Sequence, residues 1–158
     1  MRKPTRILFV CHGNICRSPM AEFVMKDLVA NAGVAEDFVI ASAATRDDEI
    51  GSDIHPGTRR VLDKHGIAHT PRAARRIQRA DAEAWDCIVC MDDANVRDVV
   101  RQLGPAAAPK VHKLLEFAGS DADVADPWYT GDFAATYRDV DAGCRALLAR
   151  LLSPSSES

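Results

Sequence analysis

The chain has 158 residues, of which 47% are hydrophobic, and a formal net charge of -3. This length is typical of one domain with a substantial core, and the charge gives no indication of a nucleic-acid partner. No apolar run is long enough to cross a bilayer, and the apolar stretch behind the basic N-terminus ends at Cys11, too early for a secretory signal. We therefore expect a cytoplasmic protein without a membrane partner.

Strand-like apolar runs alternate with helical patterns along the chain. The expected strands are residues 6–10, 38–41, 87–91 and, more weakly, 110–113. The expected helices are 19–31, with Pro19 in the first turn, 56–65, 92–103 and 132–151. Apolar strands separated by helices predict a single α/β domain with a parallel sheet covered on both faces. That domain should span 1–152, with 153–158 as a disordered tail.

Five cysteines, an odd number, make a disulfide framework a poor interpretation. Cys87 and Cys90 lie three apart in an expected strand, so their side chains should point to opposite faces of the sheet. The chain offers no second cysteine pair that would complete a tetrahedral metal site. We expect these two residues and Cys144 to be core thiols, and we expect no metal and no cofactor.

The strongest functional signal is residues 10–19, Val-Cys-His-Gly-Asn-Ile-Cys-Arg-Ser-Pro, between an expected strand and an expected helix. Loop N–H groups turned at Gly13 and the N-terminus of the helix would converge on an anion. The Arg17 guanidinium and the Ser18 hydroxyl would add to this positive environment. The same groups would stabilise a thiolate at Cys11 and bind a phosphoryl group.

Two alternatives to covalent phosphate chemistry are weighed at this segment. It lacks the Gly-x-x-x-x-Gly-Lys pattern of nucleotide-binding loops. The other alternative is a buried structural cysteine at a strand end with an unrelated surface arginine. The flanking strand, the Gly-Asn turn and the Ser-Pro helix start favour a nucleophilic cysteine over both.

Residues 10–22 resemble the signature of the low-molecular-weight protein tyrosine phosphatases. The similarity continues in order over about residues 6–151, through 42–45, 64–67, 74–75, 86–92 and 126–129. It implies a four-stranded parallel sheet in the order 2-1-3-4, with the phosphate loop near the topological switch point. It implies hydrolysis of phosphotyrosine, and of small aryl phosphates, through a phosphocysteine intermediate without a metal.

The resemblance also assigns roles to individual residues. Cys11 is the nucleophile, Arg17 binds the phosphate, and Asp126 in Asp-Pro-Trp-Tyr is the general acid and later the base. The phosphate-binding loop comprises His12, Gly13, Asn14, Ile15, Cys16 and Ser18. Trp128 and Tyr129 are aromatic neighbours of the substrate ring. Asn14 and Ser42 brace the loop. Cys16 either forms a protective disulfide with Cys11, as the resemblance implies, or is a small residue that packs the loop. The expected partners are tyrosine-phosphorylated proteins and a cognate tyrosine kinase, with the chain a monomer.

Two charged segments need a separate interpretation, the acidic run 47–49 and the arginines of 72–79. Asp48 stands where many family members carry an aromatic wall of the substrate pocket. The acidic run Asp47-Asp48-Glu49 either favours basic residues near the phosphotyrosine or is a solvated turn without a role. Elsewhere, arginines recur at helical spacing and predict a solvated basic stripe, with Arg75 matching a family position; they are Arg72, Arg75, Arg76 and Arg79.

Three rival functions remain beside the phosphotyrosine phosphatase. Thiol-linked arsenate reductases share the loop, but they relay electrons through cysteines that residues 92–109 lack. Phosphoarginine phosphatases carry a threonine where this chain has Ile15. A phosphate-binding or redox-sensing module without turnover would not need Cys11, Arg17 and Asp126 together.

Overall fold

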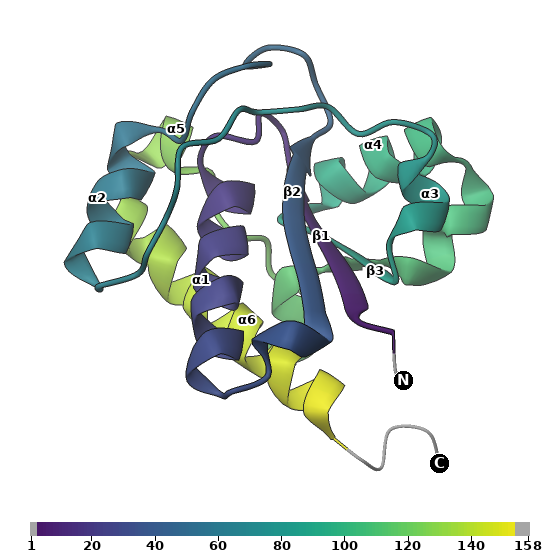
Figure 1. Cartoon of the computed structure of the whole chain (residues 1–158). Coiled ribbons are helices and arrows are strands. Elements are labelled where there is room, and N and C mark those ends of the chain that lie inside the picture. Colours follow the sequence, from purple (N-terminus) through teal and green to yellow (C-terminus); the bar gives the residue numbers. More distant parts are fainter. Residues whose placement is uncertain (1–2, 154–158) are drawn as a thin grey trace.

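Four parallel strands form one sheet at the centre of the molecule (Figure 1). The computed structural model describes residues 3–153. The strands are β1 (Thr5–Cys11), β2 (Phe38–Ala44), β3 (Cys87–Cys90) and β4 (Val111–Lys113). Their order across the sheet is β2-β1-β3-β4, with every neighbouring pair parallel. The predicted α/β class and strand order are confirmed.

Helices cover both faces of this sheet (Figure 1). The α-helices are α1 (Arg17–Asn31), α2 (Pro56–Lys64), α3 (Asp81–Ala84), α4 (Asp93–Leu103), α5 (Pro127–Thr130) and α6 (Phe133–Leu152). Short 3-10 helices are η1 (Ala35–Asp37), η2 (Pro105–Lys110) and η3 (Leu114–Ala118). The four long helices were predicted. The short ones were not, because a single turn carries no measurable periodicity.

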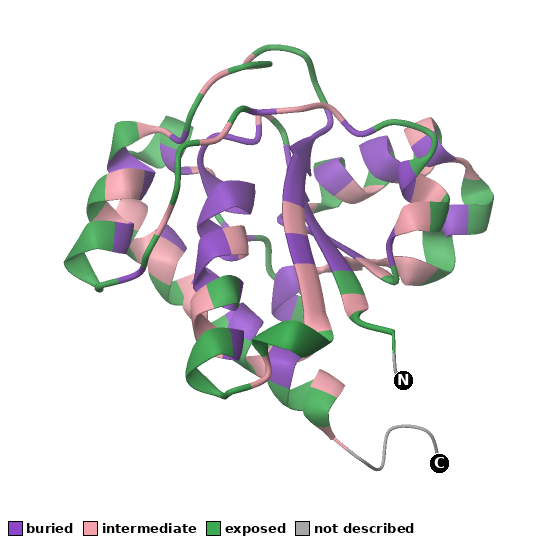
Figure 2. Ribbon diagram, viewed as in Figure 1, coloured by how far each residue is buried: buried purple, intermediate pink, exposed green. Residues whose placement is uncertain are grey.

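β1 is buried from Ile7 to Cys11 and divides the core into two halves (Figure 2). Ile7 and Phe9 face α1 and α6, whereas Leu8 and Val10 face the side covered by α4. This alternation is the period of two that a strand imposes on its side chains. With both faces covered, the strand is continuously apolar, as its sequence indicates.

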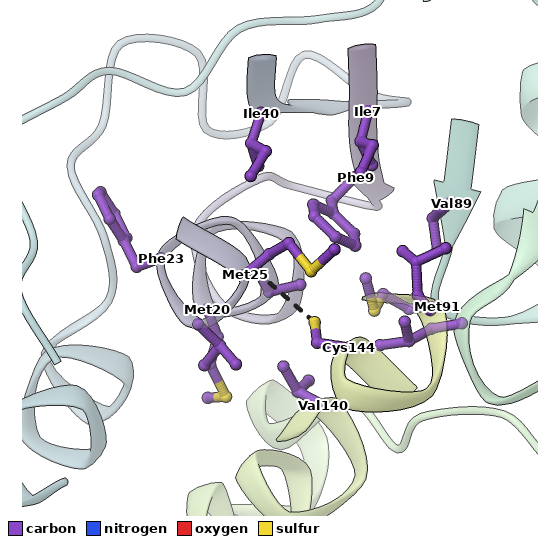
Figure 3. Close-up of a cluster of buried hydrophobic side chains, with 14 of the residues drawn as sticks. Ile7, Phe9, Met20, Phe23, Met25, Ile40, Val89, Met91, Val140 and Cys144 are labelled. Atoms are coloured by element: carbon purple, nitrogen blue, oxygen red, sulfur yellow. Dashed lines mark hydrogen bonds between the residues drawn. The ribbon is translucent and has the colours of Figure 1, made fainter. Parts of the chain in front are cut away.

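The core thiols lie where the sequence predicted them. Cys87 packs against the half of the core that contains α1 and α6, while Cys90 belongs to the other half. Cys144 is fully buried on α6, and its Sγ lies 3.8 Å from the Ala21 carbonyl oxygen of α1, to which it donates (Figure 3). Burial raises the pKa of all three thiols, to about 11 for Cys87. They are poor nucleophiles at neutral pH.

The predicted basic stripe is wrong, because its arginines do not lie on a helix. Residues 71–80 run as an irregular segment along the end of β2, where the Ala44 N–H donates to the Arg75 carbonyl at 2.7 Å. Both Arg75 and Arg76 are paired rather than free in solvent. Arg75 makes a two-pronged contact with Asp81, and Arg76 reaches Asp47 at 2.9 Å. The backbone pairing with β2 overrides the helical spacing of the side chains.

Asp81, at the start of α3, anchors the irregular segment 71–80. Besides Arg75, it accepts hydrogen bonds from the Gln78 N–H at 2.7 Å and the indole N–H of Trp85 at 2.9 Å. Burial opposes ionisation of Asp81, but these donors outweigh it and hold the pKa of its carboxyl below the usual value. Asp81 thereby also fixes the Arg75 backbone, whose N–H donates to the Asn14 side chain in the loop between β1 and α1.

The chain ends are described only in part. The expected tail at 153–158 lies outside the described residues from 154 onward, and the domain limit at 152 stays a prediction. Ser153 itself closes α6, with its N–H donating to the Arg150 carbonyl at 3.2 Å. Within residues 3–153, no helix combines the length and apolar character needed to span a membrane.

Candidate active site

The loop between β1 and α1 lies at the carboxyl end of the sheet, next to the point where the strand order reverses. β1 ends at Cys11 and α1 begins at Arg17, so the two predicted reactive residues flank a five-residue loop. Asn14, in that loop, has φ 60°, a left-handed conformation that asparagine tolerates better than most residues. The loop therefore turns back on itself, as a nest of converging N–H groups requires.

Asn14 is the internal brace of the loop. It is fully buried, and its side-chain amide donates to Ser18 Oγ at 2.8 Å and Ser42 Oγ at 2.9 Å. Its carbonyl oxygen accepts from the Arg75 N–H at 3.2 Å. The Ser42 hydroxyl in turn donates a hydrogen bond to a carboxylate oxygen of Glu22 at 2.6 Å. The loop is thereby fixed to β2, α1 and the irregular segment at once.

Two donors face the sulfur of Cys11, whose residue is only 3% exposed. The Ser18 N–H donates to Sγ at 3.4 Å, and Ser18 Oγ lies 3.1 Å from it. Because Ser18 Oγ already accepts from Asn14, its hydroxyl proton is available to the sulfur. The sulfur thus has two hydrogen-bond partners from Ser18 at the start of α1.

Arg17 is 2% exposed and is held from three directions. Nη1 donates to Asp92 at 2.8 Å and to the Val124 carbonyl at 2.9 Å, while Nη2 donates to Asp126 at 3.3 Å. Burial alone would lower the pKa of Arg17, but the Cys11 sulfur and both carboxylates outweigh it and raise that pKa. The guanidinium is a fixed positive charge beside the sulfur.

Asp126 lies at the N-terminus of α5. Its Oδ1 accepts from the Trp128 N–H at 3.0 Å, which leaves Oδ2 directed to Arg17. Trp128 and Tyr129 are 57% and 83% exposed, so both aromatic side chains stand at the surface. The short helix thus carries a carboxyl group facing inward and aromatic rings facing outward.

These residues surround a cavity of about 130 Å³. It is lined by Cys11, His12, Gly13, Ile15, Cys16, Arg17, Asp48, Glu49, Asp126, Trp128 and Tyr129. The predicted residues Asn14, Ser18 and Ser42 are not on this lining and lie behind it as support. Within residues 3–153, no group of three or more His, Cys, Asp or Glu side chains is placed to hold a metal ion.

The acidic run extends the lining on one side. Asp48 Oδ2 lies 2.8 Å from Nε2 of His12, and both side chains are at least half exposed. Glu49 packs so close to Gly13 that a Cβ there would lie 3.4 Å from its Cγ. The carboxylates of Asp48 and Glu49 therefore occupy the side of the cavity where the resemblance implies an aromatic wall.

Sequence reasoning missed several contributors. Asp92 and the Val124 carbonyl orient Arg17 from distant segments. Glu49, which the sequence placed in an acidic run of undecided role, lines the cavity. Thr58 of α2 donates to the Cys16 carbonyl at 3.1 Å and ties that helix to the loop. For Asp92 a signal existed, since it directly follows the expected strand 87–91 and so falls at the carboxyl edge of the sheet, where such folds bind ligands.

A parallel α/β domain with an anion-binding loop, an embedded arginine and a cysteine at the end of its first strand belongs to the class of cysteine-dependent phosphatases. Residues 6–156 match the family described as low molecular weight phosphotyrosine protein phosphatase. The chain belongs to this family, which confirms the resemblance and makes it a protein-tyrosine-phosphatase by class.

Individual relatives agree with this assignment. The chain is 37% identical over 147 residues to the low molecular weight protein-tyrosine-phosphatase YfkJ of Bacillus subtilis, covering 92% of this chain and 94% of that protein. It is 37% identical to the corresponding phosphatase of Sus scrofa, with the same coverage. The crystal structure of YfkJ superposes with a TM-score of 0.91, at 36% identity over 94% of each chain.

Proposed function

We propose that the chain hydrolyses phosphotyrosine in proteins through a phosphocysteine on Cys11. The observation that carries this is the convergence of a buried sulfur, a fixed guanidinium and a carboxyl group on one cavity. The loop N–H groups and Arg17 bind the phosphate and stabilise the charge that spreads over its equatorial oxygens in the transition state. These N–H groups and the Arg17 guanidinium supply the positive charge that a metal ion provides in metal-dependent phosphatases.

In the first step, Cys11 Sγ attacks phosphorus in line while Asp126 gives its proton to the departing phenolic oxygen. The products are a phosphocysteine and a free tyrosine side chain. In the second step, Asp126 takes a proton from water, and that water attacks phosphorus and releases inorganic phosphate and the Cys11 thiolate. Trp128 and Tyr129 line the cavity and offer flat faces to the tyrosine ring.

The choice of substrate is tested with phosphopeptides that differ only in the phosphorylated residue. We expect phosphate release from phosphotyrosine at least about a hundredfold faster than from phosphoserine, because the short serine side chain cannot bring phosphorus to the sulfur. Phosphoarginine serves as the third substrate. Faster release from phosphoarginine than from phosphotyrosine would replace the proposed function with the rival that Ile15 argues against.

The acidic side of the cavity is proposed to select basic residues near the phosphotyrosine. Asp48 and Glu49 line the cavity with carboxylates, and exposed pairs such as Asp48–His12 contribute little to stability and are free to exchange partners. We expect kcat/KM for lysine-flanked phosphopeptides to exceed that for glutamate-flanked ones by about fivefold. The preference should shrink in Asp48→Trp and at high salt. Equal ratios in Asp48→Trp and the unmodified protein would reject this role.

Cys16 is proposed to protect Cys11 from irreversible oxidation. Both thiols line the cavity, so the two sulfurs share one space. Burial raises the pKa of Cys16 to about 12, so peroxide oxidises Cys16 itself only slowly. Peroxide would convert Cys11 to a sulfenic acid, which Cys16 captures as a disulfide with loss of water. Activity lost to peroxide should return with dithiothreitol, whereas in Cys16→Ser it should not. Full recovery in Cys16→Ser would contradict the pairing.

The remaining proposals concern the cellular setting. A nucleophilic thiol needs a reducing compartment, which supports the cytoplasm as its location. Phosphotyrosine substrates require a tyrosine kinase that produces them, and we propose that such a kinase acts upstream. We also propose that the chain is a monomer, since its cavity is complete within one copy.

A further inference from the structure

His55 joins the phosphate loop to the segment that carries Asp126, although it lies outside the cavity lining. Its backbone N–H donates to the Ile15 carbonyl at 2.8 Å, which ties it to the loop. Its ring stands 5.8 Å from the Trp128 ring, edge to face at 82°. One residue thus contacts both the phosphate loop and the segment that carries Asp126. The helices α2 and α5, which these contacts join, lie side by side in Figure 1.

The orientation of the His55 ring is fixed by two further contacts. Nδ1 accepts from the Gly57 N–H at 2.9 Å and caps α2. This bond places the ring proton of the neutral side chain on Nε2. The ring also stacks on Phe133 at the start of α6, with centroids 5.0 Å apart and planes 23° apart. Together, the hydrogen bond and the stacking contact fix both side-chain torsions of His55.

The Phe133 ring, on which His55 stacks, is itself tightly packed. A Cβ at Gly57 would lie 2.5 Å from the Phe133 ring, so the start of α2 sits directly on that ring. Phe133 is therefore confined by Gly57 and by His55. The His55 ring, stacked on this confined ring, is therefore a rigid support for Trp128, two residues beyond Asp126.

We propose that His55 is a positioning residue that holds the Asp126–Trp128 segment over the phosphate loop through its ring. The proposal rests on the proposed role of Asp126 as general acid. If the ring is lost, Asp126 remains present but its proton is no longer held at the leaving oxygen. Misplacement of a catalytic group by about 1 Å can cost up to about a hundredfold in rate.

Leaving groups of different acidity separate this role from simple stability. Phosphotyrosine releases a weakly acidic phenol and depends on a proton donor, whereas 2,4-dinitrophenyl phosphate releases an acidic phenol that departs without one. The value of kcat/KM covers the steps up to phosphocysteine formation. Differences in binding between the two substrates also enter the ratio of their kcat/KM values. The change in this ratio on substitution, rather than the ratio itself, therefore reports the loss of proton donation.

Two substitutions divide the functions of His55, and a second histidine provides the control. His55→Asn keeps an acceptor for the Gly57 N–H but removes the ring, whereas His55→Phe keeps a ring and removes the cap. His65 sits at the other end of α2 and stacks on Tyr137 of α6, with centroids 3.9 Å apart. His65→Asn therefore removes a comparable contact between α2 and α6 without touching α5.

We expect the ratio to fall about tenfold in His55→Asn and to stay within about twofold of the unmodified value in His55→Phe and His65→Asn. Thermal unfolding of each variant records the loss of stability separately. An unchanged ratio in His55→Asn, or an equal fall in His65→Asn, overturns the proposal. Asp126→Asn should collapse the ratio; if it does not, the role of Asp126 fails and the proposal for His55 fails with it.

Discussion

Replacing Cys11 by serine is expected to reduce hydrolysis of p-nitrophenyl phosphate by at least about 10⁴-fold. The serine hydroxyl has the same neighbours but is far less ionised than a thiol, so phosphorus receives no competent nucleophile. The donors that face the sulfur, from Ser18, and the guanidinium of Arg17 remain in place. Calorimetric titration should therefore still detect binding of inorganic phosphate to the inactive variant.

Cys87→Ser is the matched control for this experiment. It makes the same exchange of sulfur for oxygen in a partly buried thiol of β3 that does not line the cavity. Its activity should stay close to that of the unmodified protein. Turnover in Cys11→Ser above a few per cent, with unfolding transitions unchanged, would show that another residue is the nucleophile.

Arg17→Lys is expected to lower kcat/KM by about 10³-fold although the positive charge is kept. Arg17 uses one nitrogen for Asp92 and the Val124 carbonyl and the other for Asp126, a geometry that needs a planar fork. A lysine ammonium cannot hold these partners and still present two donors to a phosphate. The carboxylates would then face a dianionic substrate without a fixed guanidinium between them.

Arg145→Lys controls for the exchange of an arginine elsewhere. Arg145 pairs with Asp141 on the exposed side of α6, at 3.0 Å, and takes no part in the cavity. Steady-state kinetics with both variants should show normal constants for Arg145→Lys. A loss below about tenfold in Arg17→Lys would mean that charge alone, rather than two-pronged geometry, binds the phosphate.

The sheet and the loop were predictable because their signals are local. The apolar run that becomes β1 is continuous since both faces of the strand are covered, and the loop residues are neighbours in the chain. Family resemblance supplied the strand order and the link to Asp126, which lies 109 residues from Arg17. The spacing of residue types along the sequence does not predict a contact between residues so far apart.

The rest of the site depends on contacts that only the folded chain creates. Arg17 meets the Val124 carbonyl 107 residues away, and a backbone carbonyl leaves no mark on the residue type. The arginine stripe was misread for a related reason, since backbone pairing of Arg75 with Ala44 decides that segment. His55, in the same way, looks like one of several scattered histidines until its ring meets Phe133 and Trp128.

The hydrogen bonds of Asn14 couple the opening of the phosphate loop to the opening of the whole domain. Its bonds join Ser18, Ser42 and the Arg75 backbone, so amide hydrogens of the loop should exchange with solvent only when β2 and α1 come apart. The cradle for phosphate therefore has the lifetime of the whole fold. Adaptation to different substrates is left to the exposed edge, where the side chains of Tyr129 and Asp48 are free of such ties to the core.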